Sequence, residues 1–291
     1  MDRRHFLSLG SGALLTAAIS SRMGFQGPEK LKDIGLQVYT LRDMLAKDPE
    51  GTLRSVANLG YSHIELFGYR NGKYFGKSIS EIKGLTDDLG LRVTSAHYLS
   101  GQQSTDMGTP VNQWEKAVAD AAALGQQYMA IAYLMPEERK TLDDYRRVAD
   151  ILNRAGEITA QYGLTMAYHN HDFEFTPLEG QLPADILLKK TDRNLVKFEL
   201  DIYWIVKAGQ DPLAFFRANP GRVPLWHIKD MEKGTGDFAP VGDGTIPWAT
   251  LFREQGTASM THFFVEQDTH RIGTPLENIG KSFRWLRELD Y

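Results

Sequence analysis

The stretch at residues 164–175, LTMAYHNHDFEF, is where the interpretation of this chain starts. It begins as an apolar run and ends in polar side chains, His169, Asn170, His171, Asp172 and Glu174. Such a change is typical of a buried strand that ends at a chemical site. If the strand continues through this segment, His169 and His171 are two residues apart and face the same pocket.

Three later apolar runs end in the same way. VKFELD ends at Asp201, VPLWHIKD contains His227, and HFFVEQD contains Glu266. Together with His169 they offer two imidazoles and two carboxylates, a donor set that suits a divalent cation. We therefore predict that His169, Asp201, His227 and Glu266 bind one divalent ion, which is Mn²⁺, Zn²⁺, Co²⁺ or Mg²⁺. The alternative is that each is an ordinary loop residue.

Strand and helix patterns alternate outward from this stretch. Predicted strands cover residues 34–39, 63–67, 92–97, 128–133, 164–169, 196–200, 223–228 and 262–265. Predicted helices cover residues 49–59, 80–89, 114–124, 142–162, 184–190, 212–218, 248–254 and 276–289, and Ser80 is the expected cap of the second. Eight such units predict a single (β/α)₈ TIM barrel, of class α/β, over residues 28–291, with its active site at the carboxyl ends of the strands.

A doubly wound sheet would show the same alternation of strand and helix. That fold needs a glycine-rich phosphate turn after an early strand, but the first predicted strand is followed by TLRDML. The GDG around Asp243 comes late in the chain, and we interpret it as a tight turn that leads into a helix.

Composition narrows the class of protein. Hydrophobic residues make up 42% and charged residues 24% of the 291, which is ordinary globular usage. The net charge of −4 argues against a nucleic-acid surface, because such a surface needs a clustered basic excess. There is no cysteine, so disulfides and thiolate chemistry are excluded.

The first residues have the pattern of an export signal. Arg3 and Arg4 precede an apolar, small-residue run to about residue 21, with Ala17 and Ala18 near a cleavage region. The run is short and rich in glycine and serine, so export is preferred to a stable membrane anchor. We expect residues 1–27 to be a twin-arginine signal peptide and linker, and the protein to be periplasmic. A homo-oligomer is left open.

The chain resembles the sugar phosphate isomerase/epimerase family, which has a xylose-isomerase-like TIM barrel. The resemblance runs from about residue 34 onward, through GYSHIELFG, SAHY, HNHDF, ELD, HIKD, PVGDGTIPW and VEQD. In that family Glu, Asp, His and Glu from the last four strands usually hold the metal, and Asp201, His227 and Glu266 match the last three. His169 stands at the first position instead of glutamate. Two carboxylates rather than three imply a stronger Lewis acid.

The resemblance implies a metal-dependent sugar isomerase/epimerase that removes a proton next to a carbonyl through a metal-stabilised enediolate. Glu266 is the first candidate for the base, His171 is a reserve, and Lys229 is expected to hold a substrate oxygen. Because only one of the family's two glutamate bases is present, a keto-sugar or keto-cyclitol dehydratase or lyase acting by β-elimination is the alternative. A non-catalytic sugar-binding barrel is a third possibility.

A small carbohydrate is the expected partner, with no nucleic acid. Residues Glu65, His97, Glu174, Trp204 and Trp226 are expected to bind it, because carboxylates, imidazoles and aromatic faces recognise sugars. Many relatives have a histidine where Trp204 stands, which favours a single ion. The role of Glu199 is left open.

Overall fold

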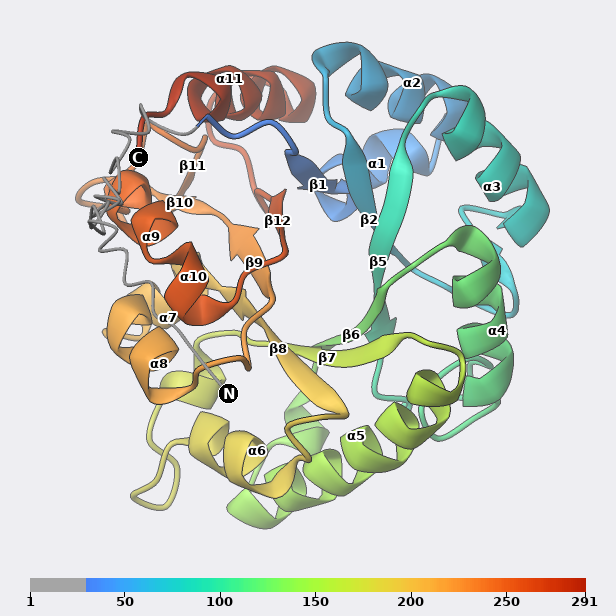
Figure 1. Ribbon diagram of the computed structural model, residues 1–291, viewed down its shortest axis with the longest axis vertical. Coiled ribbons are helices and arrows are strands. Elements are labelled where there is room, and N and C mark those ends of the chain that lie inside the picture. The colour runs from blue at the N-terminus through green and yellow to red at the C-terminus, as the bar shows by residue number, and fades with distance from the viewer. Residues whose placement is uncertain (1–29) are drawn as a thin grey trace, which may run out of the picture.

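Eight short apolar segments form the parallel strands of a closed barrel in the computed structural model, which describes residues 30–291 (Figure 1). Around the barrel they follow the chain: β1 (Gly35–Gln37), β2 (His63–Phe67), β5 (Arg92–Leu99), β6 (Tyr128–Tyr133), β7 (Thr165–His169), β8 (Val196–Asp201), β9 (Leu225–Ile228) and β12 (His262–Val265). Pairing of β12 with β1 closes the ring. The predicted (β/α)₈ barrel is confirmed.

Helices surround this barrel and cover its outer face (Figure 1). They are α1 (Arg42–Leu45), α2 (Pro49–Leu59), α3 (Ile79–Asp88), α4 (Trp114–Leu124), α5 (Leu142–Gln161), α6 (Pro183–Lys190), α7 (Ile202–Lys207), α8 (Pro212–Ala218), α9 (Trp248–Arg253), α10 (Gln255–Ala258) and α11 (Pro275–Glu288). Two hairpins, β3 (Lys73–Tyr74) with β4 (Lys77–Ser78) and β10 (Asp230–Met231) with β11 (Phe238–Ala239), lie in loops. Within residues 30–291 no helix is long and apolar enough to cross a membrane. The predicted export signal lies outside the described residues.

The predicted elements differ from the observed ones mainly at their ends. The first strand stops at Gln37, and a 3-10 turn, Val38–Leu41, follows it. The cap of α3 is Ser78 rather than Ser80, because Ser78 and Glu81 form a reciprocal capping box. Helix α7, directly after β8, was not predicted. Its six residues are too few for a clear helical period.

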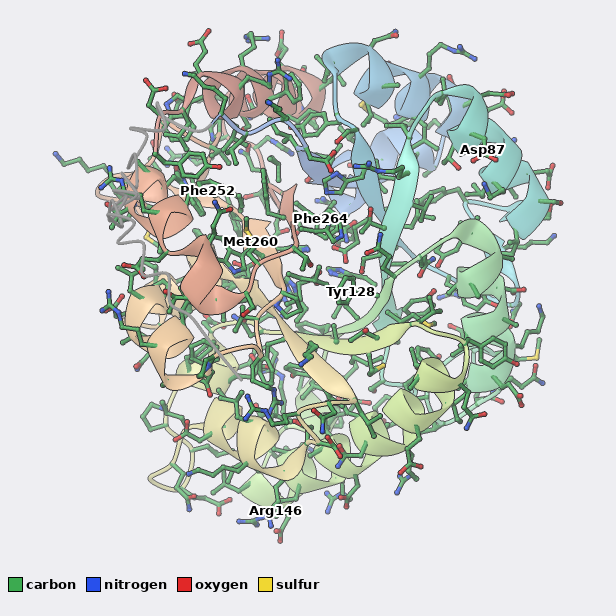
Figure 2. The ribbon with its side chains drawn as sticks, viewed as in Figure 1. Asp87, Tyr128, Arg146, Phe252, Met260 and Phe264 are labelled. Atoms are coloured by element: carbon green, nitrogen blue, oxygen red, sulfur yellow. The ribbon has the colours of Figure 1, made fainter. Side chains whose placement is uncertain are left out.

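The amino-terminal end of the barrel interior is filled with apolar side chains. Ala130, Ala167, Leu225 and Phe264 form a small buried cluster there, with Tyr128 packed against it. Figure 2 shows Tyr128 and Phe264 near the middle of the barrel. Together with the buried ring of His63, whose centroid lies 5.3 Å from that of Phe264, this cluster forms the floor of the barrel, and the polar residues described below lie above it.

A β-bulge adjusts the third strand of the barrel. Ile64 pairs with Val93, but Glu65 pairs with Ser95, so β5 has one extra residue at this point. After the bulge His97 pairs with Phe67. Because a one-residue shift reverses the face of every later side chain, the bulge is what brings His97 to the interior beside Glu65.

Asp230 organises the loop that contains the GDG sequence. Its carboxylate accepts hydrogen bonds from the backbone N–H of Gly242 at 2.9 Å and of Gly244 at 3.2 Å, and from Nε1 of Trp248 at 3.0 Å. A Cβ at Gly244 would lie 2.1 Å from Oδ1 of Asp230. The glycine is therefore needed for close approach of the backbone, in agreement with a tight turn that leads into α9.

Candidate metal centre

Four residues that end or follow neighbouring strands converge inside the barrel. His169 ends β7, Asp201 ends β8, His227 lies in β9, and Glu266 follows β12. One nitrogen or oxygen of each lies within 4.8 Å of those of the other three, and all four residues are buried. Because β7, β8, β9 and β12 are adjacent, their carboxyl ends place these groups around one point. The structure thus brings the four predicted metal ligands together.

A lysine ammonium lies among three carboxylates beside these four residues. Nζ of Lys229 is 2.7 Å from Oε2 of Glu266, 3.0 Å from Oδ2 of Asp201 and 3.1 Å from Oδ2 of Asp268. The Lys229 side chain is only 2% exposed, so it is not a solvated loop lysine. We call Asp201, Glu266 and Asp268 the upper carboxylates.

A second group of acidic side chains lies deeper in the barrel. Glu199 precedes Asp201 by two residues on β8, so it faces the same side one level closer to the floor. Oε2 of Glu199 is 2.8 Å from Nε2 of His97, and Oε2 of Glu65 is 3.1 Å from the same nitrogen. Both carboxylates are completely buried. We call Glu65 and Glu199 the lower carboxylates.

The two histidines predicted as metal ligands, His169 and His227, lie between these levels. Nδ1 of His169 is 3.2 Å from Oε2 of Glu199, and its Nε2 is 3.7 Å from Oδ2 of Asp201. Nε2 of His227 is 2.6 Å from Oε2 of Glu65, and its Nδ1 is 2.7 Å from Oε2 of Glu266. Each imidazole therefore presents one nitrogen to each level.

Burial and charge shift the protonation of these groups. Burial alone would lower the pKa of Lys229, but Asp201, Asp268 and Glu266 raise it well above its usual range. Burial would likewise lower the pKa of His97, but Glu65 and Glu199 raise it to about 9. In this structure the cation beside the three upper carboxylates is the Lys229 ammonium, and the cation beside the two lower carboxylates is the His97 imidazolium.

The donor set fits a divalent ion. The four converging residues supply two imidazole nitrogens and two carboxylate oxygens, which suit zinc, manganese, iron or cobalt. Oδ2 of Asp201 is buried and contacts the Lys229 ammonium at 3.0 Å without a well-aligned hydrogen bond, so this oxygen is available as a ligand once the ammonium moves away. Burial raises the pKa of Asp201 to about 6 although Lys229 acts to lower it, so the carboxylate is mainly ionised at neutral pH.

A cavity of about 830 Å³ opens above the centre. His169, Lys229, Glu266 and Asp268 form part of its wall. Its aromatic lining comprises Tyr39, Phe67, Tyr69, Tyr98, Tyr133, Phe173 and Trp204. Its size and its mixture of aromatic faces with a few polar groups are those of a small-molecule site.

His171 and Trp204 both line this cavity. The strand ends at His169, yet the His171 ring centroid is 5.2 Å from that of His169 and 5.4 Å from that of Trp204. Nδ1 of His171 is buried without a hydrogen-bond partner among the described residues. Burial, followed by the charge of Lys229, lowers the pKa of His171 to about 3, so its imidazole is neutral at physiological pH.

Three predicted substrate-binding residues lie elsewhere than expected. Trp226 stacks on Phe216 at 4.7 Å in the apolar layer between the barrel and α8, because its side chain points outward from β9. Glu174 is buried and accepts hydrogen bonds from the Tyr168 hydroxyl at 2.5 Å and from the His171 backbone N–H at 2.7 Å. Glu65 faces inward but lies in the lower level. The remaining two, His97 and Trp204, do line the cavity.

The sequence reasoning left the role of Glu199 open and did not single out Asp268. Each lies two residues from a predicted ligand, and for Glu199, which is in β8, strand alternation could have indicated the shared face. Arg139 and Tyr133 also line the cavity, and the guanidinium of Arg139 lies 3.6 Å from the ring centroid of Phe173. Tyr133 ends β6 and Arg139 lies in the loop after it, and neither position gave a comparable sequence signal.

Known proteins resemble this chain in sequence and in fold. The model for the xylose isomerase-like TIM barrel family matches residues 53–289. The solved structure of a sugar phosphate isomerase/epimerase from Parabacteroides distasonis is 30% identical, with a TM-score of 0.76, over 94% of this chain and 97% of that one.

Two further similarities concern enzymes and metal. An inosose dehydratase from Geobacillus thermodenitrificans is 28% identical over 51% of this chain and 55% of that protein, so the chain spans about half the length of the curated relatives it matches. The IolI protein, solved with a bound zinc atom, shares the fold, with a TM-score of 0.68 and 14% identity over 87% of this chain and 95% of that one. On its family match and its full-length structural likeness, the chain belongs to the xylose isomerase-like TIM barrel family.

Proposed function

We propose that this protein is a metal-dependent sugar isomerase/epimerase that removes a proton from the carbon next to a carbonyl group. The observation that carries the proposal is the convergence of His169, Asp201, His227 and Glu266 around one point, with His169 and Glu266 in the wall of a sugar-sized cavity. The sugar phosphate isomerase/epimerase that matches nearly the full chain supports the substrate class.

His169, Asp201, His227 and Glu266 would hold the ion, and the bound zinc of the IolI protein supports a divalent metal here. When bound, the ion polarises the substrate carbonyl and stabilises negative charge on its oxygen. Lys229 donates a hydrogen bond from the cavity wall to a second substrate oxygen, and its high pKa keeps the ammonium charged.

Two groups can accept the proton from different sides of the cavity. Glu266 follows β12, and its carboxylate stays ionised because, against the effect of burial, Lys229 and His227 lower its pKa. His171 follows β7, and its neutral imidazole has an unpartnered Nδ1. An epimerase needs a proton carrier on each face of the substrate carbon, and this pair provides one from each side.

A lyase acting by β-elimination is the second candidate. It needs a base and a proton donor on the same wall of the cavity. Oε2 of Glu266 and Nζ of Lys229 are 2.7 Å apart and provide such a pair without His171. In this case Glu266 takes the proton, the electron pair of the C–H bond forms the new double bond, and the neighbouring C–O bond breaks. The leaving oxygen then receives a proton from Lys229. The matched inosose dehydratase supports this chemistry.

One experiment tests both candidates. The protein loaded with Mn²⁺, Co²⁺ or Zn²⁺ is incubated in D₂O with a pentulose, a hexulose, a keto-inositol and a 3-keto-glucoside, and NMR follows each. A deuterium-labelled epimer or shifted carbonyl indicates an isomerase/epimerase, and an unsaturated product indicates a lyase. The His171→Gln variant should lose epimerisation but keep elimination. Sugar binding by the metal-loaded protein without exchange with any substrate would contradict both and favour a binding protein.

We also propose that residues 1–27 direct export by the twin-arginine route, on the sequence pattern alone. Periplasmic and cytoplasmic fractions are compared for the full chain and for a variant with Arg3→Lys and Arg4→Lys. The proposal predicts that the full chain reaches the periplasm and that the double variant stays in the cytoplasm.

A further inference from the structure

The lower carboxylates have no part in the proposed reaction, yet they are completely buried charges of the barrel interior. Glu65 and Glu199 are both 0% exposed. Burial of two carboxylates is costly unless they are hydrogen-bonded to groups that need them. Their hydrogen-bond partners among the described residues are the imidazoles of His97, His169 and His227 and the side-chain amide of Gln37.

The contact of Glu199 with His169 selects one tautomer. A neutral imidazole carries one N–H, and a nitrogen that binds a metal ion cannot carry it. Nδ1 of His169 lies 3.2 Å from Oε2 of Glu199, while Nε2 faces Asp201. A carboxylate accepts but does not donate, so Glu199 draws the proton to Nδ1 and leaves the Nε2 lone pair for an ion.

Glu65 selects the other tautomer at His227. Nε2 of His227 donates to Oε2 of Glu65 at 2.6 Å, and Nδ1 faces Glu266 in the upper level. In this structure Nδ1 also lies 2.7 Å from Oε2 of Glu266, so both nitrogens face carboxylates. When an ion replaces the proton at Nδ1, Glu65 keeps the other proton on Nε2. The two ligand histidines thus need different tautomers, and the lower carboxylates specify both.

The lower carboxylates are themselves fixed in place. Nε2 of His97 lies 2.8 Å from Glu199 and 3.1 Å from Glu65, so one ring bridges both. The side-chain amide of Gln37 donates to Oε2 of Glu65 at 2.7 Å, and its oxygen accepts from the Tyr39 backbone N–H at 2.9 Å. These contacts come from β1 and β5, the opposite side of the barrel from the metal ligands.

We infer that Glu65 and Glu199 are positioning residues of the metal centre: they set the tautomers of His227 and His169 and strengthen both imidazoles as ligands. The inference rests on the proposed metal site. Carboxylates that accept the second N–H of a metal-bound histidine typically contribute a factor of about 10–100 to metal affinity. The effect should therefore be visible in metal binding without any substrate.

A second cation in the lower level is a different interpretation of the same residues. His97, His169, Glu199 and His227 offer ligand atoms within 4.8 Å of one another, and Oε1 of Glu199 is buried without a donor among the described residues. This site would need the lower nitrogens of His169 and His227, which the upper site requires to be protonated. The two sites would compete for the same rings, so the positioning role is favoured.

The test measures metal affinity in variants that separate charge from hydrogen bonding. Glu199→Gln and Glu65→Gln keep an oxygen that accepts the imidazole N–H, whereas Glu199→Met and Glu65→Met remove it. Glu138→Gln is the control, because Glu138 is another buried glutamate whose carboxylate bonds to Ser100 and Met135, outside the centre. Circular dichroism and thermal unfolding check that each variant folds.

Co²⁺ titration, followed by its visible absorption and by competition with a chelator, gives affinity, stoichiometry and ligand geometry. We expect one ion per chain, affinity about 10–100-fold weaker in the Met variants, a smaller loss in the Gln variants, and no change in the control. In the zinc-loaded protein, ¹H–¹⁵N NMR should show N–H on Nδ1 of His169 and on Nε2 of His227.

Affinities within twofold of wild type in folded Met variants, or the opposite tautomers, would overturn the inference while leaving the proposed function intact. Two ions in the wild type, falling to one in Glu199→Met, would replace it by a second cation site. If the wild type binds no divalent ion at all, the proposed function fails together with the inference.

Discussion

The upper and lower carboxylates occupy the same barrel at different depths, and different cations are paired with them. The upper ones, Asp201, Glu266 and Asp268, surround the ammonium of Lys229. The lower ones contact only nitrogens of side chains fixed on strands or adjacent to them, such as His97 and His227. A lysine head on a flexible four-carbon stem can withdraw, whereas an imidazole held by a strand cannot.

This difference separates two tasks. Lys229, Glu266 and Asp268 line the cavity, and in the proposed function a metal ion would take the place of the Lys229 ammonium among the upper carboxylates. The lower carboxylates stay paired with imidazoles, and by the inference above they hold the rings of His169 and His227 in orientation. Variants of the upper and of the lower level should therefore lose different properties.

Loss of an upper ligand should have the largest effect. Asp201→Ala removes one of the two carboxylate ligands together with the cap of α7, whose Trp204 N–H bonds to Oδ1 of Asp201 at 3.0 Å. We expect loss of stoichiometric metal and a fall in kcat/KM of about 10³-fold or more, because metal stabilisation of the developing charge is worth several kcal/mol. Metal analysis and steady-state kinetics measure both. Asp243→Asn, in an exposed ion pair with Lys281, is the control; a metal-loaded, active Asp201→Ala would refute the site.

Removal of the ammonium should separate metal binding from catalysis. Lys229→Met abolishes the hydrogen bond to the substrate oxygen, so kcat should fall about 10²–10³-fold. It also releases Asp201 and Glu266 from an internal competitor, so the affinity for Co²⁺ should rise. Titration and kinetics on the same preparation test the two effects together. Weaker metal binding in this variant would show that the ammonium supports the ion rather than exchanging with it.

The lower level should control how stability depends on pH. The folded pKa of His97, about 9, lies above the unfolded value of about 6.5. Its contribution is therefore fully present below pH 6.5 and is lost as pH rises through 9, with a total of about 3 kcal/mol. Urea unfolding of metal-free wild type and His97→Gln should differ most near pH 6 and converge above pH 9. A difference that does not change with pH would contradict this assignment.

Much of the barrel could be predicted from the sequence because each strand is a short apolar run and four of the eight predicted helices are followed directly by a glycine. The four predicted ligands were found from the same pattern, because a polar residue at the carboxyl end of a buried strand lies on the face of the barrel where the active site forms. The depth at which each side chain lies in the barrel was harder to predict. Glu199 alternates with Asp201 on one face, but only the three-dimensional convergence of β2, β5 and β8 shows that it supports the histidines. His97 faces inward because of a bulge that no local sequence signal marks.

The two tryptophans predicted for the substrate site illustrate the remaining ambiguity, and they provide the prediction with the smallest effect. Trp204 lines the cavity on α7, whereas Trp226 points outward from β9 onto Phe216. Trp204→Ala should raise KM about tenfold with little change in metal affinity, because it removes an aromatic face from the substrate. Trp226→Phe should leave KM unchanged and lower the free energy of unfolding by about 1–2 kcal/mol, because it trims a packed core. Kinetics and urea unfolding on both variants test this contrast, and a KM effect of equal size at Trp226 would mean that the outer layer also shapes the site.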